Sequence, residues 1–278
     1  MQAKAHATIP EDILLRKGAR KSADIPEHVR NLLQSGQIES VNLTEWLAVN
    51  HILLFQQVIH DWEMIEDTRE TIQQLQKLNE HRIMKIIPVI ALAWLALMEH
   101  KDTEYRTQLF YSIAQHRSDS VRCWAAYMIG LDSRLSLIER LAQIRPFAAD
   151  PHFGVREIAW MAVREPIINE LPRALEHLLP WTADPDPRIR RFAIESIRPR
   201  GVWAKHIQML KDNPALALPL LELVKSDPDK YVQDSVSNWL NDASKSNPDW
   251  VRQVCNTWLQ MSDTKATRRI TTRAQRSL

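Results

Sequence analysis

Glycine is scarce in this sequence of 278 residues, which contains only 5 glycines. Glycine supplies the positive backbone φ angles of tight hairpin turns and lets a backbone approach a phosphate closely. Neither a P-loop nor a GxGxxG motif occurs in the sequence. We therefore expect neither a sheet-rich fold with many tight turns nor a phosphate-cradling loop.

Paired cysteines and clustered histidines are missing as well. The two cysteines, Cys123 and Cys255, form no CxxC pair, and the 10 histidines are scattered without an HExxH motif. A lone cysteine is usually a small buried hydrophobic residue. We therefore expect a reducing compartment, no metal site and no cofactor.

No apolar run in the sequence is long enough to cross a membrane. The longest, IIPVIALAWLALM at residues 86–98, contains Pro88 and is shorter than the roughly 20 residues that a spanning helix needs. It predicts a buried helix and no membrane partner. Residues 1–21 lack the apolar core of a secretory signal, which predicts a cytoplasmic protein.

Charge is present but unevenly distributed. The formal net charge is only +2, yet basic residues gather at residues 16–21, 188–200 and 264–278, and acidic residues at 61–70. For any one segment, ordinary surface charge is the simplest explanation. Three basic segments in one chain favour a nucleic-acid partner.

Four segments of similar form recur: HRSDSVRCWAAYMIG, ADPHFGVREIAWMAVR, ADPDPRIRRFAIESIR and SDPDKYVQDSVSNWLND. Each places Asp, often Asp-Pro, before a helix anchored by Val121, Val155, Ile189 or Val232, at steps of 34, 34 and 43 residues. Asp caps helix N-termini, and Pro fits the first helical turn. Helix pairs that recur at such a period are typical of an α-solenoid of HEAT type.

The predicted fold class is all-α, because no strand-like alternation of useful length is present. We expect a single HEAT-like α-solenoid domain over residues 26–278, with a concave binding face, and a loosely held basic arm over residues 1–25. Upstream of the repeats, the hydrophobic pattern predicts helices at residues 26–34, 43–58, 61–79, 83–99 and 102–115.

The helical period divides the repeat helices into a buried stripe and a second face. The stripe includes Trp124 and Trp239, which we expect to be packing residues. The second face should line one groove, where Trp160 suits a flat or cationic ligand unless it packs between neighbouring helices. This face carries, among others, Glu157, Trp160, Arg164, Arg191, Glu195, Arg198, Asn238 and Asn241.

Two stretches, RIRRFAIESIRPRGVW and SDPDKYVQDSVSNWLNDASKSNPDWV, resemble the HEAT-like DNA alkylation-repair glycosylases of the AlkC/AlkD superfamily, closer to the AlkC branch. The resemblance is strong over about residues 150–262. It implies a solenoid that wraps damaged duplex DNA and releases N-alkylated bases, and so a bacterial-type protein that is nucleoid-associated through DNA binding. We expect a monomer that uses no metal or cofactor. The resemblance also implies that the base is not drawn into a deep pocket, unlike in the usual base-flipping enzymes.

The resemblance assigns roles to particular residues. It places Glu195, Trp203 and Asp242 at the lesion nucleotide. The family usually has a second glutamate where this sequence has Trp160, although Arg164 is kept, and Glu157 is the candidate substitute. Further positions that match the family or carry arginines toward DNA are Arg198, Arg200, Asn238, Asn241, Arg269 and Arg273.

The centre of this predicted site is Glu195, which lies among Arg191, Arg198 and Arg200. A fixed carboxylate stabilises the positive charge that develops on the sugar when an N-glycosidic bond breaks, or it positions the attacking water. The arginines can bind phosphates or hold the carboxylate ionised. The simpler alternative is a helix-surface ion pair, worth about 0.2–0.5 kcal/mol.

Three functions are compatible with the sequence. The first is a glycosylase for alkylated bases in base excision repair. The second is a catalytically inactive relative that binds distorted or branched DNA, which Trp160 in place of glutamate favours. The third is a HEAT scaffold that binds proteins, which the three basic segments disfavour.

Overall fold

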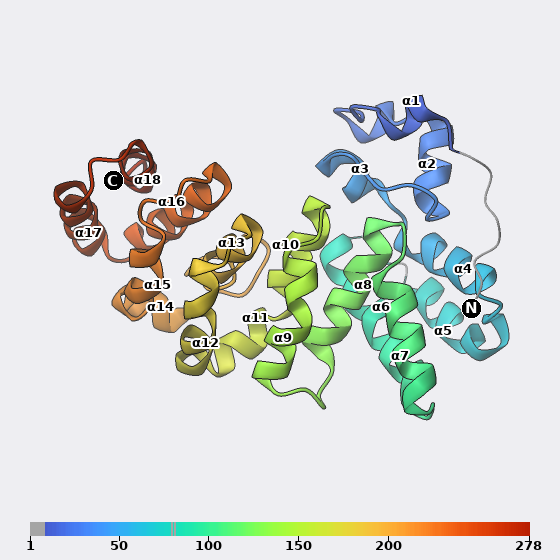
Figure 1. Cartoon of the computed structure of the whole chain (residues 1–278). Helices are drawn as coiled ribbons and strands as arrows, with labels where there is room; N and C mark the ends of the chain where they lie inside the picture. The colour runs from blue at the N-terminus through green and yellow to red at the C-terminus, as the bar shows by residue number, and fades with distance from the viewer. Residues whose placement is uncertain (1–8, 79, 81) are drawn as a thin grey trace. The chain divides into compact units, whose positions relative to one another are not determined.

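The computed structural model describes residues 9–78, 80 and 82–278, and this part of the chain consists of helices and loops without any strand (Figure 1). The all-α prediction is confirmed. The described residues divide into two compact units. The first unit contains the residues up to Ser133 together with His152–Ile158, and the second contains Arg134–Pro151 and Ala159–Leu278. That residues 26–278 form one continuous solenoid stays a prediction.

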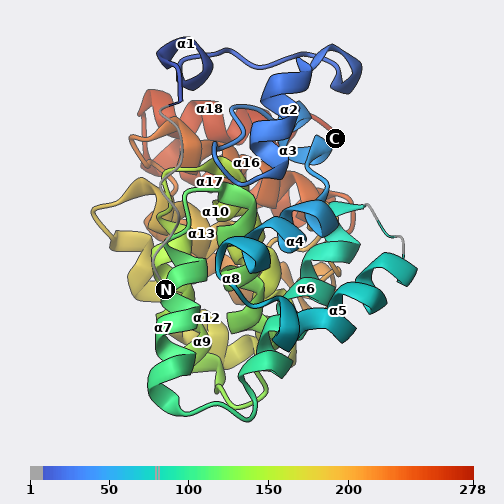
Figure 2. The same ribbon diagram turned by 90° about the vertical axis from the view of Figure 1, so that its right-hand side faces the viewer.

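Helices of the first unit follow one another through short turns. In chain order they are α1 (Glu11–Leu14), η1 (Ser22–Asp24), α2 (Glu27–Gln34), α3 (Leu43–Ala48), α4 (His51–Asp61), α5 (Ile65–Leu78), α6 (Ile83–Met98), α7 (Thr103–Ala114) and α8 (Asp119–Leu131). Both α6 and α7 pack against α8 (Figure 2). No helix within the described ranges has both the length and the apolar character to span a membrane.

The helix predicted at residues 43–58 is in fact two helices, α3 and α4. Asn50 separates them, because its side-chain oxygen accepts hydrogen bonds from the backbone N–H groups of Ile52 and Leu53 at 3.1 and 3.2 Å. This is an N-cap, and it starts a new helix inside an otherwise continuous apolar pattern. The hydrophobic period does not reveal this break between α3 and α4, whereas the N-capping asparagine indicates it.

The described part of the predicted N-terminal arm is hydrogen-bonded to α3 and the turn before it. Arg16 donates to both carboxylate oxygens of Glu45 at 3.0 and 2.6 Å and to the Glu39 carbonyl at 2.7 Å. The Asn42 amide donates to the Ala19 carbonyl at 2.9 Å. These contacts hold Arg16 to Ala19, whereas residues 1–8 lie outside the described residues.

The second unit contains the last two repeat helices, α13 and α16. Its elements are α9 (Leu137–Ala148), α11 (Arg164–Asn169), α12 (Leu171–Leu178), η2 (Leu179–Ala183), α13 (Pro187–Glu195), α14 (Gln208–Asp212), η3 (Pro214–Ala217), α15 (Leu218–Leu223), α16 (Lys230–Ser244), α17 (Pro248–Met261) and α18 (Lys265–Ala274). Helix α10 (Phe153–Ala162) begins in the first unit and ends in the second. Helix α16 packs against α13, α17 and α18.

The predicted helix starts are confirmed in the two last repeats. Asp186 accepts a hydrogen bond from the Arg188 N–H at 2.8 Å, and Asp229 accepts one from the Tyr231 N–H at 2.7 Å. Pro187 occupies the first position of α13, where no backbone donor is needed. Asp-Pro before the anchor therefore fixes where α13 begins, and so where its last residue, Glu195, falls.

The buried stripe is also confirmed. The anchors Val121, Val155, Ile189 and Val232 are all buried. Trp239 is fully buried, and its indole N–H donates to the Ile197 carbonyl at 3.0 Å. An aromatic side chain whose polar atom is satisfied inside the core is a packing residue.

Candidate active site

Glu195 ends α13 with its carboxylate inside the second unit, where the residue is only 3 % exposed. Arg198 donates to one carboxylate oxygen, Oε1, at 2.7 Å. The Ser235 hydroxyl on α16 donates to the other, Oε2, and Arg191 lies 3.7 Å from that same oxygen. The carboxylate is therefore held from three sides, which is more than a helix-surface ion pair.

Arg198 joins Glu195 to a second carboxylate. Its Nε and Nη2 atoms both contact Oδ2 of Asp242 on α16, at 2.9 and 2.8 Å. The other oxygen of Asp242, Oδ1, lies 3.5 Å from the Nζ of Lys245. One guanidinium thus bridges the end of α13 to the last turns of α16. We call Glu195, Arg198 and Asp242 the carboxylate clamp.

Glu195 and Arg198 are charged at neutral pH. Burial by itself would raise the pKa of the Glu195 carboxyl, but the charges of Arg191 and Arg198 and the Ser235 hydrogen bond hold that pKa below its usual value. Burial likewise opposes the charge of Arg198, yet Glu195 and Asp242 raise the pKa of the guanidinium. The charges therefore stabilise one another against desolvation.

Arg164 lies beneath the loop that follows α13, and it is only 2 % exposed. Its guanidinium donates to the backbone carbonyls of Ser196 at 2.6 Å and Lys205 at 3.0 Å, and also to that of Arg198. Burial and the charge of Arg198 lower the pKa of Arg164 to about 10, so it is still protonated at neutral pH. The prediction that Arg164 meets DNA is corrected, because this side chain binds main-chain oxygens inside the unit.

Trp203 is the aromatic residue that the unit offers to solvent. It is 55 % exposed. Its backbone φ is 58°, in the left-handed region that residues other than glycine rarely adopt. It lies in the loop between α13 and α14, where Arg200 donates to the Ser246 hydroxyl at 2.7 Å. The loop that follows Arg198 therefore exposes a planar apolar surface to solvent.

Trp160, by contrast, is a core residue with 1 % exposure. A Cβ added at Gly201 would lie 3.4 Å from the Trp160 ring, so the indole packs directly under the Trp203 loop. The prediction that Trp160 lines an open groove is wrong, and its packing alternative is right. Glu157 is half-buried on the part of α10 that belongs to the first unit, and its role stays a prediction.

The remaining predicted residues lie where α16 meets α18. Asn241 is buried and donates to the Ala274 carbonyl at 3.2 Å, so it ties α16 to the end of α18 and does not face DNA. Asn238 accepts from Arg276 at 2.8 Å. Arg269 and Arg273 both contact the exposed Asp234, at 2.6 and 3.3 Å. Both side chains remain partly exposed, which leaves a basic surface on α18.

Sequence reasoning missed two contacts of the clamp, Ser235 and Lys245. Ser235 occupies a position on the buried stripe at which α8, α10 and α13 carry Trp124, Ile158 and Phe192. A polar residue at a core position needs a buried partner, and here that partner is Glu195. This substitution was the available signal for Ser235, whereas nothing in the sequence pattern distinguishes Lys245 from an ordinary surface lysine.

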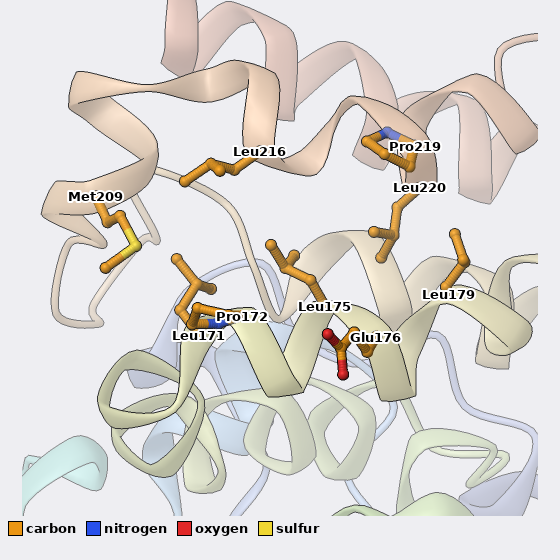
Figure 3. A pocket seen from close by; sticks show the side chains of 9 residues that line it. All are labelled: Leu171, Pro172, Leu175, Glu176, Leu179, Met209, Leu216, Pro219 and Leu220. Carbon is orange, nitrogen blue, oxygen red and sulfur yellow. The ribbon is translucent and has the colours of Figure 1, made fainter.

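A separate hollow of about 270 Å³ lies between α12 and the segment from α14 to α15 (Figure 3). Its lining is apolar except for Glu176, and it has no donor for a phosphate or a base edge. The lining residues are Leu171, Pro172, Leu175, Glu176, Leu179, Met209, Leu216, Pro219 and Leu220. The hollow shares no residue with the carboxylate clamp.

Comparison with known proteins identifies the segment that carries the clamp. Residues 157–274 match the family described as DNA alkylation repair enzyme. The uncharacterized protein YhaZ of Bacillus subtilis is 39 % identical over 97 residues, which are 35 % of this chain and 27 % of that protein. The chain therefore covers just over a quarter of that relative.

Two solved structures share the helical-repeat fold. The alkylpurine DNA glycosylase AlkC of Pseudomonas fluorescens, bound to DNA containing an abasic site analog, has a TM-score of 0.60 at 22 % identity, over 77 % of this chain and 56 % of that chain. AlkD2 of Streptococcus mutans has a TM-score of 0.58 at 26 % identity, over 76 % of this chain and 99 % of that chain. The match of residues 157–274 to the DNA alkylation repair enzyme family agrees with the resemblance of the sequence to the AlkC/AlkD superfamily.

Proposed function

We propose that the chain is a DNA glycosylase that hydrolyses the N-glycosidic bond of N-alkylated, cationic bases in duplex DNA, as a step of base excision repair. One observation carries the proposal: two carboxylates, those of Glu195 and Asp242, are fixed by the single guanidinium of Arg198. The exposed Trp203 lies in the loop that follows α13 and Arg198. The family of residues 157–274 supports the reaction class.

The clamp suits a reaction that builds positive charge. When the bond between the sugar and an alkylated base breaks, the charge moves onto the sugar, and a preorganised carboxylate stabilises it. Glu195 is enclosed by its partners and acts through its charge alone. Asp242 is buried as well, at 5 % exposure, and its Oδ1 lies 3.5 Å from the half-exposed Lys245, so a cationic nucleotide can reach that oxygen by displacing the lysine.

Arginines outside the clamp supply the attraction to DNA. Arg200, Arg269 and Arg273 carry partly exposed guanidinium groups. Contacts to phosphates fix the position of a protein on the duplex without reading its sequence. Arg198 takes no part in this, since both carboxylates occupy it, and Trp203 provides a face on which an unstacked nucleotide can rest.

The test is base release from alkylated duplex DNA by the wild type beside Glu195→Gln. The wild type is expected to release methylated bases under single-turnover conditions, and the variant to be slower. If the wild type binds alkylated duplex DNA but releases no base over many hours, the glycosylase proposal is overturned.

The second candidate is a relative that binds distorted or branched DNA without catalysis. Its supporting observation is Trp160, which is buried at the position where the family resemblance places a second glutamate. That position cannot supply a carboxylate to DNA here. Binding to a four-way junction that exceeds binding to linear duplex, with no base release, is the result that favours this candidate.

A further inference from the structure

We propose that Arg164 is a positioning residue that holds both ends of the loop carrying Trp203, residues 199–204, and so sets where that indole meets DNA. The inference deepens the proposed function and rests on it for its catalytic consequence. It has a structural consequence that can be measured without any base release.

The geometry ties the loop at its beginning and its end to one side chain. Arg164 donates to the carbonyls of Ser196 and Arg198, just before the loop, and to that of Lys205, just after it. A backbone hydrogen bond from the Ile207 N–H to the Pro199 carbonyl, 3.1 Å long, closes the same loop. The guanidinium thus lies under the loop as a shared anchor.

Physical chemistry explains why arginine is needed at this position. The carbonyls of Ser196, Arg198 and Lys205 all lie beyond α13, which ends at Glu195, so the hydrogen-bond ladder of that helix does not satisfy them. A guanidinium offers five N–H donors in a planar fork, so it can satisfy three carbonyls that converge from different directions. A lysine ammonium is a compact charge at the end of a flexible stem and cannot span the same three oxygens.

Trp203 shows that the loop is held under constraint. A tryptophan with a φ of 58° is strained, and such a conformation persists only when the surroundings impose it. Gly201 lets the loop backbone lie close to the anchor. A Cβ added at this glycine would lie 3.4 Å from Arg164 Nη2 and 3.2 Å from the Ala204 Cβ. Without the anchor, we expect the loop to relax and the indole to leave its displayed position.

The kinetic test is a double-mutant cycle of Arg164→Lys and Trp203→Ala. A displacement of about 1 Å at a contact that positions the substrate costs roughly 100-fold in rate, so Arg164→Lys should slow single-turnover base release by about that factor. In the Trp203→Ala background the same change should cost less than about threefold, because the residue through which it acts is gone. Equal fold losses in the two backgrounds would overturn the inference.

A matched control separates positioning from general destabilisation. Arg122 is also buried, donates to the carbonyls of His116 and Arg117, and pairs with Glu39 in the first unit. Arg122→Lys should lower the melting temperature comparably but leave the rate within about twofold. An Arg122→Lys rate loss equal to that of Arg164→Lys would show that both act only through stability.

Limited trypsin digestion tests the anchor without DNA. The bonds after Arg200 and Lys205 should be cut slowly in the wild type and at least tenfold faster in Arg164→Lys, with no change in Arg122→Lys. Unchanged cleavage at both bonds overturns the inference whatever the activity. If Arg164→Lys does not fold, Gly201→Ala replaces it, because its added Cβ would lie 3.2 Å from the Ala204 Cβ, a tight contact that shifts the backbone of the loop over the anchor without changing a charge. Gly201→Ala must then accelerate cleavage at these bonds.

Discussion

Arg198 contacts Asp242 twice, through Nε at 2.9 Å and through Nη2 at 2.8 Å, and both contacts end on the same oxygen, Oδ2. This leaves Oδ1 of Asp242 for another partner, while the third nitrogen of the guanidinium binds Glu195. Every guanidinium nitrogen of Arg198 thus contacts a carboxylate and the residue is only 8 % exposed, which disfavours the phosphate contact that its place among basic residues suggested. Its function is to hold two negative charges in fixed positions.

Glu195→Gln should slow base release by about 10²–10³, or about 2.7–4 kcal/mol in activation free energy, because it deletes a preorganised charge while keeping the volume. DNA affinity should stay equal or rise, since less negative charge faces the phosphates. Single-turnover rates and binding titrations measure both effects. The control is Glu165→Gln, which removes an exposed carboxylate paired with Lys205. Equal rates for wild type and Glu195→Gln would contradict the role of the clamp.

Substitution of Trp203 should affect activity, whereas substitution of Trp239 should affect stability. Trp203→Ala is expected to leave the melting temperature nearly unchanged and to damage base release, because the indole is exposed. Trp239→Ala should instead cost roughly 3–5 kcal/mol in the free energy of unfolding, as for other buried aromatic residues. Thermal melts and release assays on both variants check this. The opposite assignment of effects would mean that the faces are reversed.

Binding to DNA should be salt-sensitive and indifferent to sequence. Each phosphate that the protein neutralises contributes about 0.9 to the slope of log K against log salt, so Arg200→Glu with Arg273→Glu should flatten that slope by about twice this amount. The control is Arg69→Glu, an exposed arginine on α5 that pairs with Glu66. Fluorescence anisotropy over a salt series gives the slopes. Affinity that does not change with salt would point to a protein partner.

Lys245 should compete with cationic ligands for Asp242. Because the lysine is 47 % exposed and its ion pair spans 3.5 Å, a cation can replace it at little cost. Lys245→Met should therefore raise the preference for a duplex with a pyrrolidine abasic analog over one with a neutral tetrahydrofuran analog, by up to about fivefold. Lys230→Met removes the same charge from the start of α16 and should leave that preference unchanged. An unaltered ratio in Lys245→Met would argue that Asp242 does not meet the cation.

Acid should destabilise the first unit through His51. Burial lowers the pKa of this histidine to about 3, and its Nδ1 accepts a hydrogen bond from the Trp124 indole at 3.0 Å. In the unfolded chain the same group binds a proton near its ordinary pKa of 6.5. The unfolded state therefore gains a proton that the folded state does not, and stability falls as the pH drops from 6.5 toward 3, by roughly 1.4 kcal/mol per pH unit.

Melting temperatures between pH 7 and pH 4 measure this slope. His51→Gln keeps an acceptor for Trp124 but cannot be protonated, so its melting temperature should depend less on pH over that window. The same slope in wild type and variant would assign the acid sensitivity to other groups.

The helices and their buried stripe could be predicted from the sequence because both follow from local rules. Asp186 and Pro187 fix the start of α13, and Ile189 follows from the 3.6-residue period. What periodicity does not reveal is which off-stripe side chains are covered by the next helix. Trp160 and Asn241 share the same helical face as Glu195, yet they are packing and tying residues, because loop 199–204 and α18 cover them.

The three residues of the carboxylate clamp could be predicted from the sequence, but the contact between Arg198 and Asp242 could not. The family resemblance predicts Glu195, Arg198 and Asp242 as site residues. The helical period by itself predicts only a local ion pair between Glu195 and a neighbouring arginine. The bridge from Arg198 to Asp242 joins residues 44 positions apart, so it depends on how α13 packs against α16. Such a contact is a property of the tertiary structure and has no local signature.

The burial of the clamp has an evolutionary consequence. Removing one partner of a buried ion pair costs about 3–5 kcal/mol, because the remaining charge is left without compensation. A lineage that no longer needed base release would therefore keep Glu195, Arg198 and Asp242 simply to stay folded. Trp203 has no such protection, since it is exposed and its backbone is strained. Among descendants of this chain, loss of the tryptophan should precede loss of the clamp, so the tryptophan is the better marker of retained activity.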